Sequence, residues 1–596
     1  MQTYLSGQST PSIVMAQSTA RHEPAASRRR LPSSAALACL ALWTLGIVLA
    51  AIQSWLWRFT LSNDTVSYLD MGDYFFHGHP EAIVNGLWSP LYAFLLGATV
   101  TLFRTSIYSE YPAVHVLLFL IFVLALGCFE FLLRQLQLVR VRFAGNGSVA
   151  EADWAWIVIA HVIFLWASLE RIRVSETNPD MLLAAFFYLA CGLLARIASG
   201  RGSWATFAAL GLALGLGYLT KAAMLPLTFI LVATAFAISR RQRAKVLVST
   251  CVFLLIAAPY VIALSIQKGR FTVGESGKYN YAVHVNGIPR HHWQGENPST
   301  GTPLHPTRKI WDSPAVYEFK TPIPGTYPQW YDPSYWYDGI TPKFHWRQMF
   351  FTLRYNLRAE VASLLGALDG VLPLALLLLF SVARRKRQIA GNLSRLLFLV
   401  VPAILGLGLY ACVHYEERYA GGFYTVGFCC LFFAVLWENE PRTGVLNRGI
   451  ALLLTLMLVF TSRSFASPPR QVFGISDFPQ TVAEDIANMG LRPGDQIASL
   501  NFVNLSIVHW ARLDRLKIIE EIYYWPNSGE GTTSFWKADR ATQEQVLKLF
   551  KASGARALIS SDAPSGLDAS QWSRVGDTDY YLLWLSKVTE SGEIER

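Results

Sequence analysis

The amino-acid sequence contains many apolar stretches long enough to cross a lipid bilayer, and no other feature restricts its fold as strongly. A helix needs about 20 predominantly apolar residues to span the hydrocarbon core, and we find about eleven stretches near that length. Hydrophobic residues make up 52% of the 596 residues. We therefore predict a mainly α-helical, polytopic membrane protein with about eleven transmembrane helices. The stretches are Ser34–Trp57, Val114–Gln135, Trp154–Leu169, Pro179–Ile197, Trp204–Leu219, Ala222–Ser239, Val246–Ile266, Val361–Ala383, Leu396–Val413, Gly421–Trp437 and Gly449–Thr461.

Basic residues fall on every second loop between these stretches. Arg28, Arg29 and Arg30 precede the first stretch, and further basic clusters follow the second, fourth, sixth, eighth and tenth. This alternation is the positive-inside pattern, and it predicts a cytoplasmic N-terminus with residues 1–33 as a disordered cytoplasmic tail. The net charge of +10 then reflects topology rather than a nucleic-acid surface, so we expect no nucleic-acid partner. All seven cysteines lie in apolar stretches, which argues against a disulfide framework and against a cysteine metal site.

The same topology divides the chain into three parts. Residues 34–462 form a transmembrane domain with a first outer loop at 59–111 and a long outer loop at 267–356. The long loop is rich in Trp, Tyr, Pro and His; such rings suit sugar faces, and they equally suit packing of the loop onto the membrane. Residues 463–596 alternate between short β-like and helical segments, which predicts a small extracytoplasmic α/β domain with a mostly parallel sheet.

Ionisable residues recur where the apolar stretches meet the outer side. Charged groups at membrane depth are expensive and usually functional. Lys221 is the clearest case because it interrupts an apolar stretch, although a lysine that merely marks a turn is the alternative. Among the acids, Asp64 lies nearest the bilayer boundary, while any one aspartate of its segment could instead cap a helix or belong to a solvated face. The candidate site residues are Asp64, Asp70, Asp73, Arg171, Arg173, Glu176, Asp180, Lys221, His414, Arg418 and Tyr419.

The order of these segments resembles the GT-C class of membrane glycosyltransferases, which use polyprenyl-phosphate-linked sugars. Relatives in that class include protein O-mannosyltransferases, the aminoarabinose transferase of lipid A and galacturonosyltransferases of lipopolysaccharide core. The resemblance extends over roughly Ser34 to Trp437. It rests on the segments "SNDTVSYLDMGDYFFHG", "WSPLYAFLLG", "ETNPDMLLAAFFYLACGLLAR", "LGLGYLTKAAMLP" and "EERYAGGFY".

The resemblance implies that Asp64 is the catalytic base, because it matches the acidic residue of the first outer loop. Several relatives carry an acidic pair where this chain has Asp64 between Asn63 and Thr65, so metal use stays open. Asp64, Glu176 and Asp180 are the candidate ligands of a divalent cation, which prefers oxygen; alternatively, Glu176 and Asp180 position the sugar. Asp70 and Asp73 are expected to position the loop or the acceptor.

The chemistry of such a transfer fits the residue types. A carboxylate can take the proton of an attacking hydroxyl, and fixed cations can stabilise the phosphate that leaves. Lys221 and Arg418 are the first candidates for that second task, followed by Arg171, Arg173 and His414. We predict inverting transfer of a sugar from a polyprenyl-phosphate donor to a hydroxyl of a glycan, lipid or protein, at the outer face of a bacterial inner membrane. The alternatives are a transporter or flippase of a lipid-linked saccharide and a non-catalytic membrane scaffold.

Overall fold

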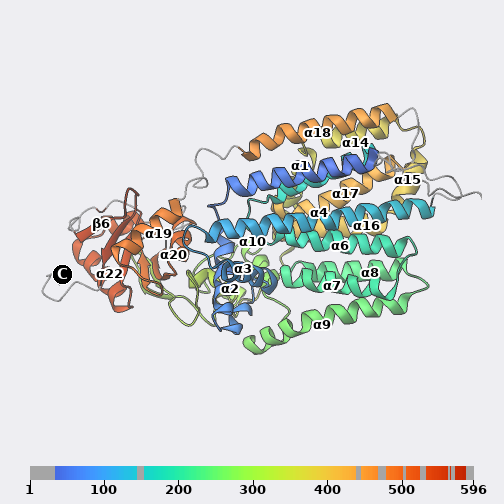
Figure 1. The fold of residues 1–596 in the computed structure, drawn as a ribbon. Coiled ribbons are helices and arrows are strands. Elements are labelled where there is room, and N and C mark those ends of the chain that lie inside the picture. Colours follow the sequence, from blue (N-terminus) through green and yellow to red (C-terminus); the bar gives the residue numbers. More distant parts are fainter. Residues whose placement is uncertain are drawn as a thin grey trace, which may run out of the picture.

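The protein is described by a computed structural model that covers most of the chain. The structure describes residues 34–143, 154–437, 444–466, 478–500, 505–523, 532–561, 564 and 571–585. The predicted disordered tail at 1–33 lies outside the described residues. Figure 1 shows a bundle of long helices with a separate, smaller domain beyond one end of it.

The bundle consists of apolar helices, as the sequence predicts. Seven described helices are long and apolar enough to cross a membrane, or eight if the bent pair α15–α16 is one span, and four shorter apolar helices accompany them. The chain is therefore an integral membrane protein, and the number eleven stays a prediction. The bundle helices are α1 Ser34–Leu56, α4 Glu110–Phe143, α5 Trp154–Trp166, α6 Asp180–Ala198, α7 Trp204–Thr220, α8 Met224–Ile238, α9 Arg243–Lys268, α14 Val371–Val382, α15 Lys386–Arg395, α16 Leu397–Ala411, α17 Glu417–Val435 and α18 Gly444–Ala466.

Two short helices lie across the end of the bundle that faces the smaller domain (Figure 1). We call this the domain end, where α1 ends and α6 begins, and the opposite end the far end. Helices α2 (Asn63–Phe76) and α3 (Pro90–Phe103) approach each other closely at Gly72. A Cβ atom on Gly72 would lie 2.4 Å from the carbonyl oxygen of Ala93. Only glycine permits this contact, which fixes how α2 lies against α3.

The eighth predicted apolar stretch is not one helix. Helix α13 (Trp346–Leu365) ends before a turn, and α14 starts after it at Val371. Leu368 and Asp369 have φ angles of 47° and 54° within this turn, a left-handed conformation that ends a helix. Asp369 therefore lies in a turn and not inside a membrane helix.

The long loop is folded rather than disordered. It contributes α10 (Ser276–His284), a 3-10 turn at Pro298–Thr300, strands β1 (Arg308–Trp311) and β2 (Val316–Glu318), and the short helices α11 (Pro328–Tyr331) and α12 (Pro333–Trp336). Many of its aromatic rings are buried, among them Trp293, Trp336 and Tyr337. Trp293 and Tyr337 stack on each other within the loop, whereas Trp330 contacts Trp88 of the first outer loop.

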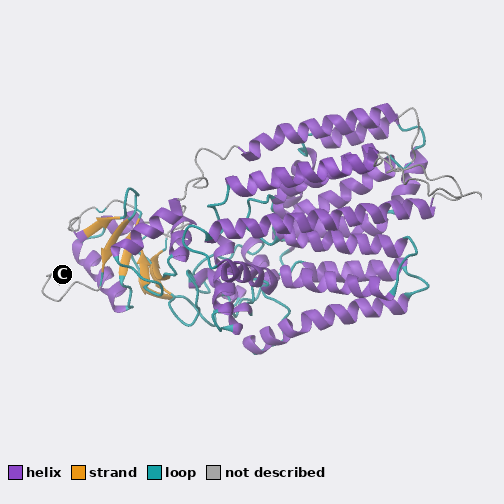
Figure 2. Cartoon of the chain, in the orientation of Figure 1, coloured by secondary structure: helices purple, strands orange, loops and turns teal. Residues whose placement is uncertain are grey.

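The C-terminal domain is built on a mixed sheet, drawn in orange in Figure 2. The strand order is β1-β2-β4-β3-β5-β7-β6, and only the pairs β3–β4 and β3–β5 are parallel. The prediction of a mostly parallel sheet is therefore wrong. The antiparallel pairing of β2 with β4 has no local signal in the sequence, because β2 comes from the long loop. The elements are α19 Phe478–Met489, β3 Gln496–Ser499, α20 Leu505–Leu513, β4 Lys517–Ile522, α21 Thr532–Lys537, α22 Arg540–Ala552, β5 Ala557–Ser560, β6 Trp572–Arg574 and β7 Tyr581–Trp584.

A buried arginine joins the C-terminal domain to the bundle. Arg512 of α20 is 2% exposed, and its guanidinium lies 2.9 Å from Asp73, 3.3 Å from Glu110 and 3.5 Å from Asp70. Arg515 reinforces it with contacts of 2.9 Å to Asp73 and 2.6 Å to Glu110. Burial raises the pKa of Asp70 to about 6, although the charge of Arg512 favours the ionised form. Asp70 and Asp73 thus hold two parts of the chain together.

We expect Arg512→Leu to destabilise the contact between the C-terminal domain and the bundle by about 3–5 kcal/mol, because it leaves buried carboxylates without their counter-ion. Limited proteolysis and thermal unfolding of the detergent-solubilised protein measure this effect. The matched control is Arg556→Leu, which removes a 42% exposed arginine paired with Asp495 inside the same domain. An exposed pair contributes about 0–1 kcal/mol. Equal loss of stability in both variants would contradict the assignment.

Candidate active site

A cavity of about 160 Å³ lies at the domain end of the bundle and collects most of the predicted site residues. Its walls come from helix ends far apart in the sequence and from α10 of the long loop. They include side chains for both expected tasks: the carboxylate of Asp64 and the cations of Lys221 and Arg418. The lining residues are Asp64, Tyr68, Leu87, Trp88, Ser89, Asn178, Pro179, Asp180, Lys221, Ala222, Ser276, Tyr279, Asn280, His284, Arg290, Trp330, His414, Glu416, Arg418 and Tyr419.

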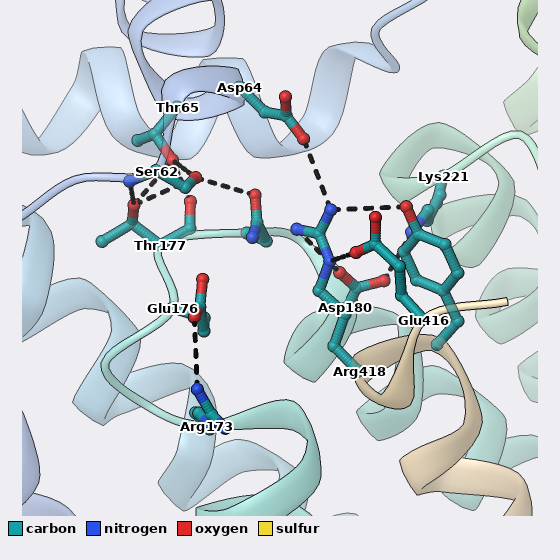
Figure 3. Close-up of polar contacts among 12 residues, drawn as sticks. Ser62, Asp64, Thr65, Arg173, Glu176, Thr177, Asp180, Lys221, Glu416 and Arg418 are labelled. Atoms are coloured by element: carbon teal, nitrogen blue, oxygen red, sulfur yellow. Dashed lines mark hydrogen bonds and ion pairs between the residues drawn. The ribbon is translucent and has the colours of Figure 1, made fainter. Parts of the chain in front are cut away.

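A network of hydroxyl groups fixes the start of α2, and with it Asp64 (Figure 3). The backbone N–H of Ser62 donates to Thr177 Oγ1 at 2.8 Å, and the Ser62 hydroxyl donates to Asn178 Oδ1 at 2.9 Å. Thr65 Oγ1 lies 2.7 Å from Thr177 Oγ1. These bonds tie the first turn of α2 to the turn that precedes Asp180. Ser62 is the residue before the helix, so Asp64 is not its N-cap.

Asp180 lies between the two cations. Lys221 Nζ is 2.5 Å from Asp180 Oδ1, and Arg418 Nη1 is 3.8 Å from Asp180 Oδ2. Asp180 is the first residue of α6, where the helix dipole also favours a negative charge. Its side chain is only 3% exposed, so a paired cation is needed to keep the charge there. Asp180 thereby fixes both cations at the cavity wall.

Lys221 lies at the break between two helices. It is the residue after α7, with an extended backbone at φ −157° and ψ 131°. Its Nζ is 3.7 Å from the centre of the Tyr419 ring, a geometry for a cation–π interaction. Burial lowers the pKa of Lys221, and the charge of Asp180 opposes this shift. The lysine is therefore held by groups on α6 and α17, which does not fit a side chain that only marks a turn.

Arg418 is the centre of the polar contacts. Its guanidinium lies 3.6 Å from Asp64 Oδ2 and 2.5 Å from Glu416 Oε2, and it donates to the hydroxyl of Tyr419 at 3.3 Å. Although burial alone would raise the pKa of Glu416, the hydrogen bond with His414 and the charge of Arg418 hold it at about 2. Glu416 is therefore a carboxylate at neutral pH and orients the arginine.

The long loop supplies part of the cavity wall. His284 of α10 stacks on His414 with ring centres 3.8 Å apart, and burial, with the neighbouring His414, lowers the pKa of His284 to about 4. Trp88 lies edge-on to Trp330, with ring centres 5.8 Å apart. Trp88 and Trp330 thus add aromatic rings to a lining that is otherwise rich in charged groups.

Five of the predicted residues do not line the cavity. Arg171 lies 2.8 Å from Glu417, and Arg173 lies 3.8 Å from Glu176; none of Arg171, Arg173 and Glu176 is a lining residue. Figure 3 shows the Arg173–Glu176 pair away from Arg418. Arg173 has a φ of 64°, so the chain turns at this point and only the end of the segment, at Asp180, faces the cavity. Asp70 and Asp73 also lie outside the lining.

The candidate metal ligands are not brought together. Among the described residues, Asp64, Glu176 and Asp180 do not form a group of three ligand atoms close enough to share an ion. Asp64 and Asp180 instead face the guanidinium of Arg418 from two sides (Figure 3).

Several lining residues were not predicted from the sequence. Tyr279, His284 and Arg290 come from the long loop, and Glu416 comes from the segment that also supplies Arg418. The aromatic and histidine content of the loop was a general signal for a functional surface. It did not indicate which of its residues would face the bundle.

The fold is similar to that of ArnT from Cupriavidus metallidurans. The apo structure of ArnT matches with a TM-score of 0.51 and 13% identity, over 92% of this chain and 98% of that chain. ArnT bound to undecaprenyl phosphate matches with a TM-score of 0.51 and 12% identity, over 94% and 99%. The Archaeoglobus fulgidus oligosaccharyltransferase in the apo form matches with a TM-score of 0.47 and 13% identity, over 87% and 69%. No protein-family model matches the chain, and no curated protein matches it. The likeness to ArnT confirms the predicted GT-C type of membrane fold.

Proposed function

We propose that the protein is a glycosyltransferase that moves a sugar from a polyprenyl-phosphate donor to a hydroxyl group of a glycan, lipid or protein. One observation carries this proposal: a single cavity at the domain end holds a carboxylate, Asp64, beside two fixed cations, Lys221 and Arg418. ArnT, which shares the fold, has been crystallised with undecaprenyl phosphate. A lipid phosphate is the leaving group that such cations would stabilise.

The cations serve the departing phosphate. As the bond from the anomeric carbon to the phosphate oxygen breaks, negative charge grows on the phosphate, and preorganised cations lower the energy of that state. Lys221 and Arg418 come from the ends of different helices and are held by Asp180 and Glu416. Little reorganisation is then needed when the charge develops. Arg290 of the long loop lines the same cavity and adds a third positive charge.

Asp64 serves the incoming hydroxyl. Its carboxylate is 27% exposed and contacts Arg418 at 3.6 Å, so one oxygen is open to an acceptor. The acceptor oxygen forms a bond to the anomeric carbon, its proton passes to Asp64, and the electron pair of the breaking bond leaves with the phosphate. A single displacement of this kind inverts the anomeric centre.

The proposal includes the placement of the protein in its membrane. The alternating basic loops support an N-terminus in the cytoplasm, with the domain end and the C-terminal domain on the extracytoplasmic side of a bacterial inner membrane. A donor anchored by its lipid would then present its sugar at the depth of the cavity. The aromatic wall of Trp88 and Trp330 would contact the apolar face of that sugar.

Reconstitution in liposomes tests the function. Purified protein is supplied with polyprenyl-phosphate sugars and with hydroxyl acceptors of each class, and the covalent product is identified by mass spectrometry. We expect a glycosylated acceptor and free polyprenyl phosphate in equal amounts. Movement of intact donor across the bilayer without a product would instead support a transporter and overturn the proposal. The control for unspecific loss of activity is Arg540→Ala, which alters an 81% exposed arginine of α22.

A further inference from the structure

A second cluster of polar side chains lies inside the bundle, away from the cavity. Cys39 of α1, Glu130 of α4 and His161 of α5 place one sulfur, one oxygen and one nitrogen within 4.8 Å of one another. His161 is completely buried and Glu130 is largely so. Polar groups inside a membrane bundle are expensive unless they have partners or a function. The transfer chemistry proposed above makes no use of them.

The distances of Glu130 Oε2 to the other two atoms are those of neighbouring ligands on one zinc ion, and the third pair lies within 4.8 Å. Cys39 Sγ is 3.5 Å from Glu130 Oε2, and His161 Nε2 is 3.4 Å from the same oxygen. In a tetrahedral site with Zn–S near 2.3 Å and Zn–N or Zn–O near 2.0 Å, neighbouring ligand atoms lie about 3.3–3.5 Å apart. Apart from this contact with Glu130, His161 Nε2 has no hydrogen-bond partner among the described residues, which leaves its lone pair available to a cation.

Neighbouring groups orient two of the three ligands. His161 Nδ1 is 2.8 Å from the carbonyl oxygen of Ile157, which places the ring proton on Nδ1 and leaves Nε2 as the acceptor. Arg134 Nε donates to Glu130 Oε1 at 2.8 Å, which leaves Oε2 facing the cysteine and the histidine. Metal-binding histidines and carboxylates are commonly held by such outer hydrogen bonds.

An open cavity of about 410 Å³ borders the cluster at Cys39 and Glu130, with Trp43 and Trp156 among its walls. It offers an entry route for an ion and room for a fourth ligand. Catalytic zinc sites have three protein ligands and one exchangeable position, whereas structural sites are closed by four. With three protein ligands and an open side, the cluster has the pattern of a site with an exchangeable position.

We propose that Cys39, Glu130 and His161 bind a single zinc ion with one exchangeable coordination position. The ion would connect α1, α4 and α5. Binding requires the thiolate, so the thiol proton that Cys39 directs at Glu130 is released as the Zn–S bond forms. The site is separate from the cavity at the domain end and does not depend on the proposed transfer activity.

Metal binding by the full-length protein tests the proposal. The protein is purified in detergent without a histidine tag and titrated with Zn²⁺, and then with Co²⁺ as a spectroscopic substitute. We expect a single bound zinc ion per chain, proton release on binding, and for Co²⁺ the visible absorption of a tetrahedral site with a thiolate-to-metal band. Cys39→Ser, Glu130→Gln and His161→Gln should each weaken zinc binding by more than about 100-fold, the upper range for loss of an outer-shell partner.

The matched control is Cys251→Ser, since Cys251 is an exposed cysteine on α9 and its removal should leave zinc binding unchanged. Cys39→Ser is nearly isosteric, so it decides the outcome even if a variant of the more buried His161 fails to fold. Thermal unfolding without zinc checks that each variant is intact. If the wild-type protein takes up no zinc, or if Cys39→Ser binds it as tightly as wild type, the proposal is overturned.

Discussion

Replacing Asp64 by Asn is expected to reduce sugar transfer by about 10²- to 10⁴-fold, the usual range for loss of a general base. The amide keeps the size of the side chain and a carbonyl oxygen that can accept from Arg418, so the cavity should stay intact. It cannot accept the acceptor's proton. Initial transfer rates in liposomes at saturating donor measure the effect, and donor binding should change little.

Two further variants make this result specific. Asp312→Asn alters an aspartate that is 95% exposed and lies 3.0 Å from Lys309, and it should transfer sugar at the wild-type rate. Asp73→Asn weakens the contact with Arg512, so it should lower stability more than the rate per folded molecule. Near-wild-type activity in Asp64→Asn would show that another group takes the proton.

Removing either cation is expected to slow transfer by about 10²- to 10³-fold, corresponding to about 2.7–4 kcal/mol for a preorganised charge-stabilising group. Lys221→Ala and Arg418→Ala each remove a charge that faces the proposed phosphate position, so kcat should fall more than donor affinity. Arg418→Lys should recover only part of the rate, because lysine keeps the charge but loses the planar fork that contacts Asp64 and Glu416.

In these variants, a loss of stability has to be distinguished from a loss of catalysis. Arg418 is 17% exposed and serves as counter-ion to several carboxylates, so thermal unfolding must accompany the kinetics. A donor with a better leaving group than a lipid phosphate should rescue both variants if the cations act on the departing charge. Normal turnover in both alanine variants would remove the assigned phosphate site.

The main features of the fold were predictable because membrane helices leave a local signal. Long apolar runs and alternating basic loops indicate a polytopic bundle, and single charges inside such runs are conspicuous. Lys221 and Asp180 could be identified as candidate site residues in this way. The break between α13 and α14 was missed, because Gly366 and Gly370 are compatible with an apolar helix until the left-handed residues between them are seen.

The rest of the site depends on contacts between distant segments. The segment from Glu170 to Asp180 carries several charges, and no periodicity shows which of them faces the cavity. The sequence therefore predicts Arg173 and Glu176 as site residues together with Asp180, although in the structure they pair with each other outside the cavity. Tyr279 and His284 could not be selected, because the position of α10 is set by the folded loop as a whole.

The pairing of β2 with β4 has a consequence for how the chain can be divided. The segment between α9 and α13 contributes α10 to the cavity wall and β1 and β2 to the sheet of the C-terminal domain. Truncating the chain after α18 would remove β4, the partner of β2, and expose a new sheet edge. Exposed sheet edges promote aggregation. The part of the chain after residue 466 is thus not a detachable module. In chimaeric proteins, this part and the long loop would have to be exchanged together. Exchanging one without the other would disturb both the pairing of β2 with β4 and the lining of the cavity.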